Sequence, residues 1–337
     1  MSAPFPRAVY LAGAAALTPF GAGWRDLAAR IAGGAAPASA DVPALAPGDD
    51  PCEPRHRKMM SRAAYLAAAV VRAALREAAV AALDLPPAEL GCFLGVGASG
   101  GEIPELEAIL RESVAGGAFR LDRFGDAGLR AANPLFAFQL MNNFTLCHAA
   151  ILAGLEGPNA AFFSRGAGTV RALREAAFAV ADGDAPAALA GGADSALYPV
   201  TAFELARAAA HARPSEAAAV LTLSARPAPI RLLHADVISH SLAPRSGERV
   251  GVSGPYLVVV TASDPDARAA LARDSAGDAT EVLVLEPTLG ETLAAAPAVA
   301  WTVAFDWLAA RPRGQARVVS RGLDGELGVV DLAKEDA

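Results

Sequence analysis

One segment of this chain, residues 157–196, constrains the fold more than any other. It predicts a short apolar strand at Ala160–Phe163, a turn of small residues at Ser164–Gly168 and a helix that opens at Thr169. A second strand is predicted at Ala187–Ala190 and ends in two glycines. Such a strand–turn–helix unit places one residue at a helix N-terminus, where free N–H groups and the helix dipole stabilise an anion.

Enzymes use a turn of this kind to hold a reactive Cys or Ser, because its field lowers a thiol's pKa and stabilises an oxyanion. Here the turn reads Arg165-Gly166-Ala167-Gly168 and carries no nucleophile. Ser164 supplies the nearest hydroxyl, but no matched histidine can serve it as a base, so we interpret it as a turn or cap residue. Arg165 could bind an anion at the helix start, and we favour an ion pair at an interface or the surface instead.

This segment resembles the nucleophile region of the β-ketoacyl synthases, whose fold is that of the thiolases. In that family a GPN tripeptide leads through a strand to a turn that carries cysteine, then to a helix and to a strand ending in AGGA. Gly157–Asn159 and Ala190–Ala193 fall at matching distances, and the family's cysteine falls on Gly166. The likeness covers most of the first 225 residues, including Val9–Gly23, Arg57–Ala79, Cys92–Gly101 and Asn133–Gly157.

The C-terminal part departs further from the family pattern. A synthase carries one His in an HGTGT-like loop, a Lys and a second His in a KxxxGH stretch, and a glycine-rich loop near its end. Val284–Ala296 resembles the second stretch, with Glu286 at the Lys position and Glu291 at the His position. Val319–Leu332 resembles the last loop with most glycines replaced, and the HGTGT loop has no counterpart. The resemblance therefore implies that all three catalytic functions are lost, and we expect negative charge at the two glutamates to oppose condensation.

Bulk properties fit a cytoplasmic globular protein. A chain of 337 residues can bury a large core. Mean hydropathy is +0.32, yet charges interrupt the longest apolar stretch, Ala63–Leu83, so we expect no membrane span. Arg7 and the apolar residues after it mimic a signal peptide, but the turn and amphipathic helix that follow favour a first core strand.

Charge and cysteine content exclude other classes. The net charge of −7 argues against a nucleic-acid partner. Cys52, Cys92 and Cys147 lie far apart without metal-type spacing, which fits a reducing compartment and predicts no metal. We also expect no cofactor.

Alternating strands and helices predict an α/β layered protein, and the resemblance specifies a thiolase-like layered fold of two pseudo-repeated halves with the C-terminal half shortened. Strands are predicted at 8–12, 91–97, 160–164, 187–191, 217–224, 256–262, 281–285, 316–320 and 327–332, and helices at 23–33, 57–83, 102–115, 134–153, 169–182, 200–211, 264–273 and 291–309. Residues 33–54 read as a surface loop, and 242–255 as the boundary between halves. The predicted division is 1–241 and 242–337.

The remaining polar candidates favour structural roles. The histidines are His56, His148, His211, His234 and His240, and none has a spacing typical of a metal face or a catalytic triad. Glu286 and Glu291 could share acid and base work, as paired carboxylates do. We favour loss of function over a new function at that pair.

The predicted helix at Asn133–Gly154 carries bulky apolar residues over more than one face. Core packing explains at least half of them. In ketosynthase dimers the equivalent helix walls the acyl tunnel, and in the partners called chain-length factors large residues on it stop the growing chain. By position, the resemblance implies a tunnel or interface role for Phe136, Phe138, Met141, Phe144, Phe163 and Arg165.

These observations favour a catalytically inactive, chain-length-factor-type subunit that pairs with an active β-ketoacyl synthase as a heterodimer. It would shape the acyl tunnel for a polyketide, polyene or fatty acyl chain, with an acyl carrier protein as a further candidate partner. The basic cluster Arg55–Arg62 could meet that acidic protein, or be the solvated start of a helix. The alternatives are an independent decarboxylase or acyltransferase that uses Ser164 or the glutamate pair, and a scaffold subunit without a tunnel.

Overall fold

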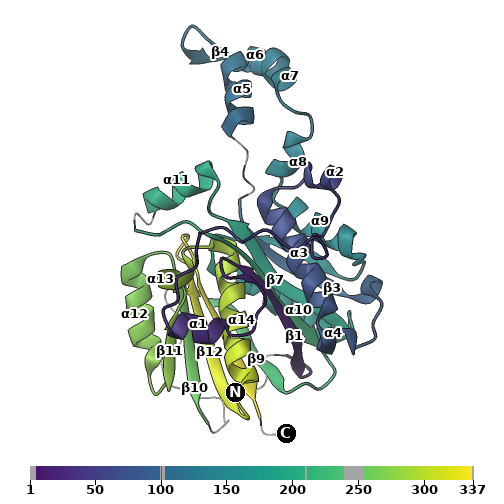
Figure 1. Ribbon diagram of the computed structural model, residues 1–337, viewed down its shortest axis with the longest axis vertical. Coiled ribbons are helices and arrows are strands. Elements are labelled where there is room, and N and C mark those ends of the chain that lie inside the picture. Colours follow the sequence, from purple (N-terminus) through teal and green to yellow (C-terminus); the bar gives the residue numbers. More distant parts are fainter. Residues whose placement is uncertain (1–4, 99, 101–102, 209–210, 239–253, 336–337) are drawn as a thin grey trace.

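The computed structural model describes residues 5–98, 100, 103–208, 211–238 and 254–335, and within them eleven strands form one mixed sheet (Figure 1). The strand order is β11-β10-β12-β13-β9-β1-β8-β7-β3-β6, with the short β2 paired to β1. The strands are β1 (Val9–Thr18), β2 (Gly21–Ala22), β3 (Gly91–Val96), β6 (Asn159–Phe163), β7 (Ala187–Ser195), β8 (Glu216–Ser224), β9 (Ile230–Ile238), β10 (Tyr256–Ala262), β11 (Glu281–Val284), β12 (Gly314–Arg321) and β13 (Leu327–Lys334).

The sheet consists of two copies of one five-strand pattern. If the strands of each copy are numbered along the chain, both copies place them side by side in the order 3-2-4-5-1. The first copy reads β6-β3-β7-β8-β1, and the second reads β11-β10-β12-β13-β9. In both, the first three strands are parallel and the last two add antiparallel. The copies join where β1 pairs with β9. The predicted pseudo-repeated halves are confirmed.

The second copy is the shorter one. The first copy runs over residues 9–224, whereas the second occupies only 230–334. Most of the difference lies in two connections. The connection between the first and second strands covers 19–90 in the first copy and 239–255 in the second, and the connection between the second and third strands covers 97–158 and 263–280. The predicted boundary at 242–255 lies largely outside the described residues, so the division into 1–241 and 242–337 stays a prediction.

Two buried helices form the central layer between the halves of the sheet. α10 (Val170–Asp182) and α14 (Ala296–Ala309) share one hydrophobic core with the inner faces of both copies, and Trp301 on α14 is fully buried in it. Alternation along β8 explains how one strand serves two layers, because Ala217, Ala219, Leu221 and Leu223 face this core while Ala218 and Val220 face a second one. That second core lies under α3 (Arg62–Arg76) and α9 (Phe144–Ala153), and α12 (Pro265–Ala276) packs against β10 in the second half.

Two long predicted helices are broken, so those predictions were wrong. The 57–83 helix divides into α2 (Pro54–Arg57), α3 and α4 (Ala78–Ala81). Ser61 starts α3 because its hydroxyl accepts a hydrogen bond from the Ala64 N–H at 3.1 Å. The 134–153 helix divides into α8 (Phe136–Leu140) and α9, because Met141 has extended backbone.

Most other predicted elements occur with shifted ends. β7 continues through Gly191-Gly192 to Ser195 instead of ending there. β1 covers Val9–Thr18 near the middle of the sheet, and so extends beyond the first core strand predicted at 8–12. The further helices are α1 (Leu27–Ala32), α11 (Pro199–Ala208) and α13 (Glu286–Leu289). Within the described ranges, every helix is too short or too polar to cross a bilayer.

A folded excursion between β3 and α8 projects away from the body (Figure 1). It contains α5 (Ile103–Ser113), the β4–β5 hairpin (Val114–Ala115 and Ala118–Phe119), α6 (Leu121–Arg123), a π-helical turn at Phe124–Gly128 and α7 (Leu129–Ala131). We call residues 103–131 the arm.

The two glycines of β7 are required by close packing and generate a stability prediction. A Cβ on Gly191 would lie 2.0 Å from the Ala219 carbonyl oxygen. Replacing Gly191 by Ala should therefore lower the free energy of unfolding by roughly 2 kcal/mol or more, because backbone atoms cannot yield. Gly48→Ala is the matched control, since a Cβ there meets nothing within 4 Å. Urea denaturation measures both, and equal stability of the two variants would contradict the packing argument.

Candidate functional site

The turn after β6 is closed by its own hydroxyl. Ser164 is buried; its Oγ donates to the Gly166 carbonyl oxygen at 2.7 Å and accepts from the Gly166 N–H at 3.1 Å. Both hydrogen-bonding functions of the side chain are thus engaged in the turn, as the turn interpretation from sequence expects. No histidine is among its hydrogen-bond partners.

Gly166, where the sequence resemblance implies the family's cysteine position, combines an unusual backbone with a covered surface. Its φ of +130° and ψ of −104° lie outside the regions that residues with a Cβ normally adopt. A Cβ there would lie 2.7 Å from Cα of Gly322, in the hairpin between β12 and β13. This hairpin is attached to the turn, because the Leu323 N–H donates to the Arg165 carbonyl oxygen at 3.0 Å. A side chain at position 166 would therefore require the hairpin to move.

Arg165 makes an ion pair, as we favoured from the sequence. Its Nη1 lies 2.8 Å from Oε2 of Glu204 on α11. The guanidinium carbon also lies 5.3 Å from the centroid of the Phe163 ring, within cation–π range. Arg165 thus connects the end of the edge strand β6 to α11.

Glu286 is the first residue of α13, Glu291 follows two positions after its end at Leu289, and both side chains are buried. The Thr261 hydroxyl donates to Oε1 of Glu286, and Oε2 of Glu286 lies 3.7 Å from Nη1 of Arg268. Oε1 of Glu291 accepts from the Leu293 N–H at 2.7 Å. In both side chains Oε2 is buried without a hydrogen bond. The free energy needed to bury a carboxyl group whose oxygen lacks a hydrogen bond is lowest when the group is protonated and uncharged.

A third carboxyl group, Asp194 at the end of β7, belongs to the same cluster. It accepts from the N–H groups of Ser195 at 2.8 Å and Ala294 at 3.2 Å. Burial raises the pKa of Asp194 to about 7. Burial, together with the nearby charge of Glu291, raises the pKa of Glu286 to about 8, and burial raises the pKa of Glu291 as well.

These pKa values correct one expectation from the sequence. We expected negative charge at Glu286 and Glu291 to oppose condensation, but burial keeps Glu286 mostly protonated near neutral pH. Neither side chain supplies the ammonium or imidazole that the family pattern places at these positions.

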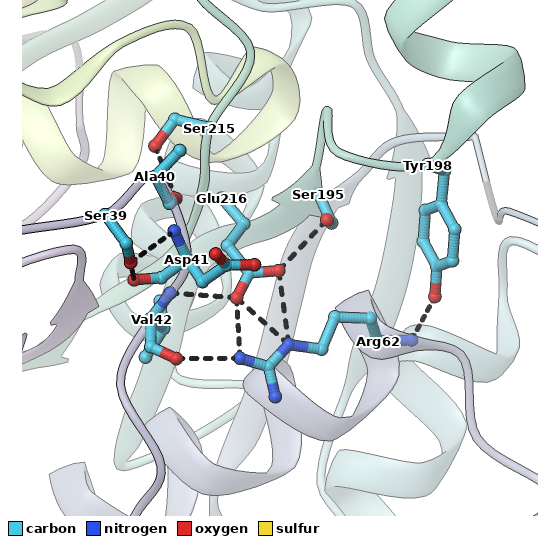
Figure 2. A network of polar contacts seen from close by, with 9 residues as sticks. All are labelled: Ser39, Ala40, Asp41, Val42, Arg62, Ser195, Tyr198, Ser215 and Glu216. Carbon is cyan, nitrogen blue, oxygen red and sulfur yellow. Dashed lines mark hydrogen bonds and ion pairs between the residues drawn. The ribbon is translucent and has the colours of Figure 1, made fainter.

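A polar network that sequence reasoning missed holds the ends of β7 and β8 (Figure 2). Arg62 at the start of α3 donates from Nη2 to Oε1 of the buried Glu216 at 2.6 Å and from Nε to both of its oxygens. Glu216 also accepts from the Ser195 hydroxyl at 3.0 Å and from the Val42 N–H at 2.9 Å. Since Ser195 follows Asp194, the network ties the predicted 33–54 loop to the strand that carries the carboxyl cluster.

Further hydrogen bonds complete this attachment. The Ser215 hydroxyl donates to the Ala40 carbonyl oxygen at 2.9 Å, and the Ser215 N–H donates to the Glu291 carbonyl oxygen at 2.9 Å. The Tyr198 hydroxyl accepts a hydrogen bond from the Arg62 N–H (Figure 2). Arg62 and Glu216 are 154 positions apart, so local patterns cannot predict that they pair. The one available sign was a charged residue, Glu216, at the start of an otherwise uncharged strand.

The predicted tunnel residues are distributed over α8, α9 and β6. Phe136 is buried, Phe144 is half-buried, and Phe138 and Met141 are 40% and 48% exposed. The Phe138 and Phe144 rings meet edge to face with centroids 5.2 Å apart. A hollow of about 420 Å³ brings Met141 together with Phe163, and its lining is completed by Val96, Leu140, Asn142, Asn143 and Ala161. Phe136, Phe138 and Phe144 are not part of this lining.

Other candidate residues lie outside the cluster. Cys92 is buried in β3, and burial raises its pKa to about 12, so it stays a thiol. Burial lowers the pKa of His148, whose ring lies beside that of Phe144. His240 lies outside the described residues. Across the described part of the chain, no three His, Cys, Asp or Glu side chains converge as a metal site would require.

Comparisons with known proteins agree with this architecture. The family model described as "Beta-ketoacyl synthase, N-terminal domain" matches residues 12–221, which is more than half of the chain. A search of curated proteins finds no match.

Three solved structures share the fold at low sequence identity. One is described as "AntDE:AntF (apo): type II PKS acyl-carrier protein in complex with its ketosynthase bound to the hexaketide", with 15% identity and a TM-score of 0.73 over 98% of this chain and 99% of that one. "The ishigamide ketosynthase/chain length factor" has 21% identity and a TM-score of 0.71 over 98% and 100%. A β-ketoacyl synthase from Burkholderia phymatum STM815 has 15% identity and a TM-score of 0.72 over 98% and 100%.

The buried carboxyl cluster predicts that stability falls as pH rises. Because the pKa of Glu286 is about 8 in the folded chain and near 4.5 when unfolded, the folded state holds the extra proton between these values. The free energy of unfolding should therefore decrease by roughly 1 kcal/mol or more from pH 5 to pH 8. Glu286→Gln should reduce this slope and stabilise the chain at pH 8.

Urea denaturation at pH 5, 6.5 and 8 measures both slopes. Glu326→Gln is the control, since Glu326 pairs with Arg171 at a solvent-accessible position and should leave the slope as in the wild type. A Glu286→Gln slope equal to that of the wild type would contradict burial of a neutral Glu286.

Proposed function

The chain belongs to the β-ketoacyl synthase family, and we propose that it is a non-catalytic member that pairs with an active ketosynthase and shapes its acyl tunnel, as chain-length-factor-type subunits do. One observation carries the proposal. The position that the family gives to its nucleophile is Gly166, whose backbone and hairpin cover leave no room for a reactive side chain.

The surroundings of Gly166 support the same conclusion. Condensation needs a thiolate to carry the acyl chain and groups that stabilise the oxyanion or enolate. Here the corresponding positions hold two buried carboxyl groups, one of which has a pKa of about 8. A neighbouring hydroxyl does not rescue the chemistry, because Ser164 is engaged in its own turn. This weighs against an independent decarboxylase or acyltransferase that uses Ser164.

The edge of the sheet supports pairing with a homologous subunit. β6 is the terminal strand of the described sheet, so one side of its backbone is available to a strand from another chain. Phe163 at its end is 54% exposed. We propose that the matching strand of an active ketosynthase adds here. The solved ketosynthase/chain length factor and the ketosynthase with its carrier protein provide the precedent for both kinds of partner.

The hollow beside β6 supports the tunnel role. Met141 and Phe163 face it from two elements, at the side where the partner strand would add. A polyketide, polyene or fatty acyl chain that grows on the partner would end against these apolar side chains. Arg55 and Arg57 in the basic cluster pair with Glu53 and Asp50. These pairs reduce the positive charge that could attract an acidic acyl carrier protein.

Product length tests the tunnel role directly. Coexpressed with an active ketosynthase of the same organism, the chain should copurify as a heterodimer. Met141→Ala should then lengthen the product by one or more extender units, because truncation enlarges the apolar hollow that Met141 lines. Phe138→Ala should act in the same direction if the ring of Phe138, which contacts that of Phe144, also faces the chain in the complex. Ile151→Ala on α9 is the control, since Ile151 is an apolar residue that is 75% exposed and does not line the hollow.

Mass spectrometry of the products measures the effect. Unchanged length across alanine variants of Phe136, Phe138, Met141 and Phe144, in a heterodimer that still forms, would leave the scaffold role alone. Failure of the wild-type chain to copurify with any such ketosynthase would contradict the pairing itself.

A further inference from the structure

A cavity lies at the end of the sheet opposite the turn that follows β6. β6 and β7 are both parallel to β3, so Ser195 at the end of β7 lies on the same side as that turn. β8 returns antiparallel and ends at Ser224, opposite Ala187 at the start of β7. The connection 225–229 and Lys334 at the end of β13 border the cavity there, on the side of the body away from the arm (Figure 1). We call it the basal cavity.

The basal cavity has the size and the wall of a small-ligand site. Its volume is about 410 Å³, and such sites have volumes of roughly 300–1,000 Å³. Most of the wall is apolar and comes from both copies of the strand pattern. Leu11 and Leu83 line it from the first copy, and Ile230 and Phe305 line it from the second. Because Leu11 pairs with Ile230 where the copies join, the cavity lies on their junction.

Two cations, Arg226 and Lys334, interrupt the apolar wall. Among the described residues that line the cavity, none is Asp or Glu. Neither cation forms an ion pair within the described part of the chain, and Glu335, which follows Lys334, pairs with Arg231 instead. The wall therefore carries positive charge without a matching anion.

Hydrogen bonds to the ends of two helices hold these cations in place. Nη1 of Arg226 donates to the Leu83 carbonyl oxygen at 2.6 Å, just beyond α4. Nζ of Lys334 donates to the Ala309 carbonyl oxygen at 3.1 Å, at the end of α14. The backbone N–H of Arg226 also donates to the Ser224 hydroxyl at 3.0 Å. A guanidinium has five N–H donors and an ammonium has three, so both groups keep donors for an anion in positions that are already fixed.

We propose that the basal cavity binds a free carboxylic acid with an apolar tail, its carboxylate on Arg226 and Lys334 and its tail against the apolar wall. A nucleotide or a sugar requires many polar partners, which this wall lacks. A purely apolar ligand would cover the two cations without pairing them. An acid with one charge and one apolar tail matches both parts of the wall. The site is separate from the hollow beside β6 and does not depend on the pairing proposed there.

Calorimetric titration of the purified full chain at pH 7 tests the site with three probes. Octanoate should bind about tenfold more tightly than hexanoate, because two more methylene groups are buried. It should also bind about tenfold or more tightly than 1-octanol, which has the tail without the charge.

Charge-removing variants test the two cations. Arg226→Gln and Lys334→Gln should each weaken octanoate binding about tenfold and leave 1-octanol binding nearly unchanged. Arg273→Gln is the control, since Arg273 is an exposed arginine on α12 that does not line the cavity. Circular dichroism confirms that each variant is folded.

Hydrogen exchange of the unmodified chain gives a readout that needs no variant. Amides in 79–83 and 225–230 should exchange more slowly with saturating octanoate. Absence of octanoate binding, absence of this protection, or equally tight binding of 1-octanol would overturn the proposal and leave the two cations as donors to helix ends only. Octanoate binding that Met141→Ala changes and Arg226→Gln does not would place the acid beside β6 and overturn it as well. Formation of the heterodimer is measured separately, so each of these outcomes leaves the proposed function standing.

Discussion

Burial of α10 and α14 between the two halves of the sheet is the interaction on which the rest of the structure depends. α14 is buried along almost its whole length and α10 buries its apolar face, so strands of both copies remove this apolar surface from water. The central layer therefore fixes the position of β6, β7 and β11 relative to one another. Because the turns and acidic residues of the site follow these strands, their geometry is set by packing of the core and not by the loops themselves.

The same packing determines the backbone geometry and the protonation of the groups at this site. Backbone approaches are so close that Gly166 and Gly322 leave no space between the turn and the hairpin. Behind them, burial suppresses ionisation of Glu286 and raises the pKa of Asp194 to about 7. The turn at Ser164–Gly166 is thus closed by its own hydrogen bonds, and the carboxyl groups of Glu286 and Asp194 hold their protons more strongly than exposed carboxyl groups do. Exposed apolar side chains, among them Met141 and Phe163, lie instead beside the edge strand β6.

Local sequence was sufficient for the parts of the site that lie on adjacent elements. The strand–turn–helix at 157–182 follows from the residue pattern, and Ser164 is bonded in its turn as interpreted. The family resemblance, and not spacing, implies that Gly166 stands where a nucleophile is expected. Helical periodicity failed at Met141, because the pattern carries no signal for an extended residue within an apolar run. Protonation of Glu286 was missed for a different reason, since the pKa depends on burial by residues remote in sequence. The Arg62–Glu216 pair and the basal cavity likewise exist only once the chain is folded.

The central claim is that carbon–carbon bond formation occurs on another polypeptide, and intact-protein mass spectrometry tests it most directly. The heterodimer would be purified, incubated with an acyl-loaded and a malonyl-loaded carrier protein, and each chain weighed separately. The account predicts an acyl thioester on the partner ketosynthase and an unmodified mass for this chain. An acyl ester or thioester adduct on this chain, formed in the absence of the partner, would contradict it.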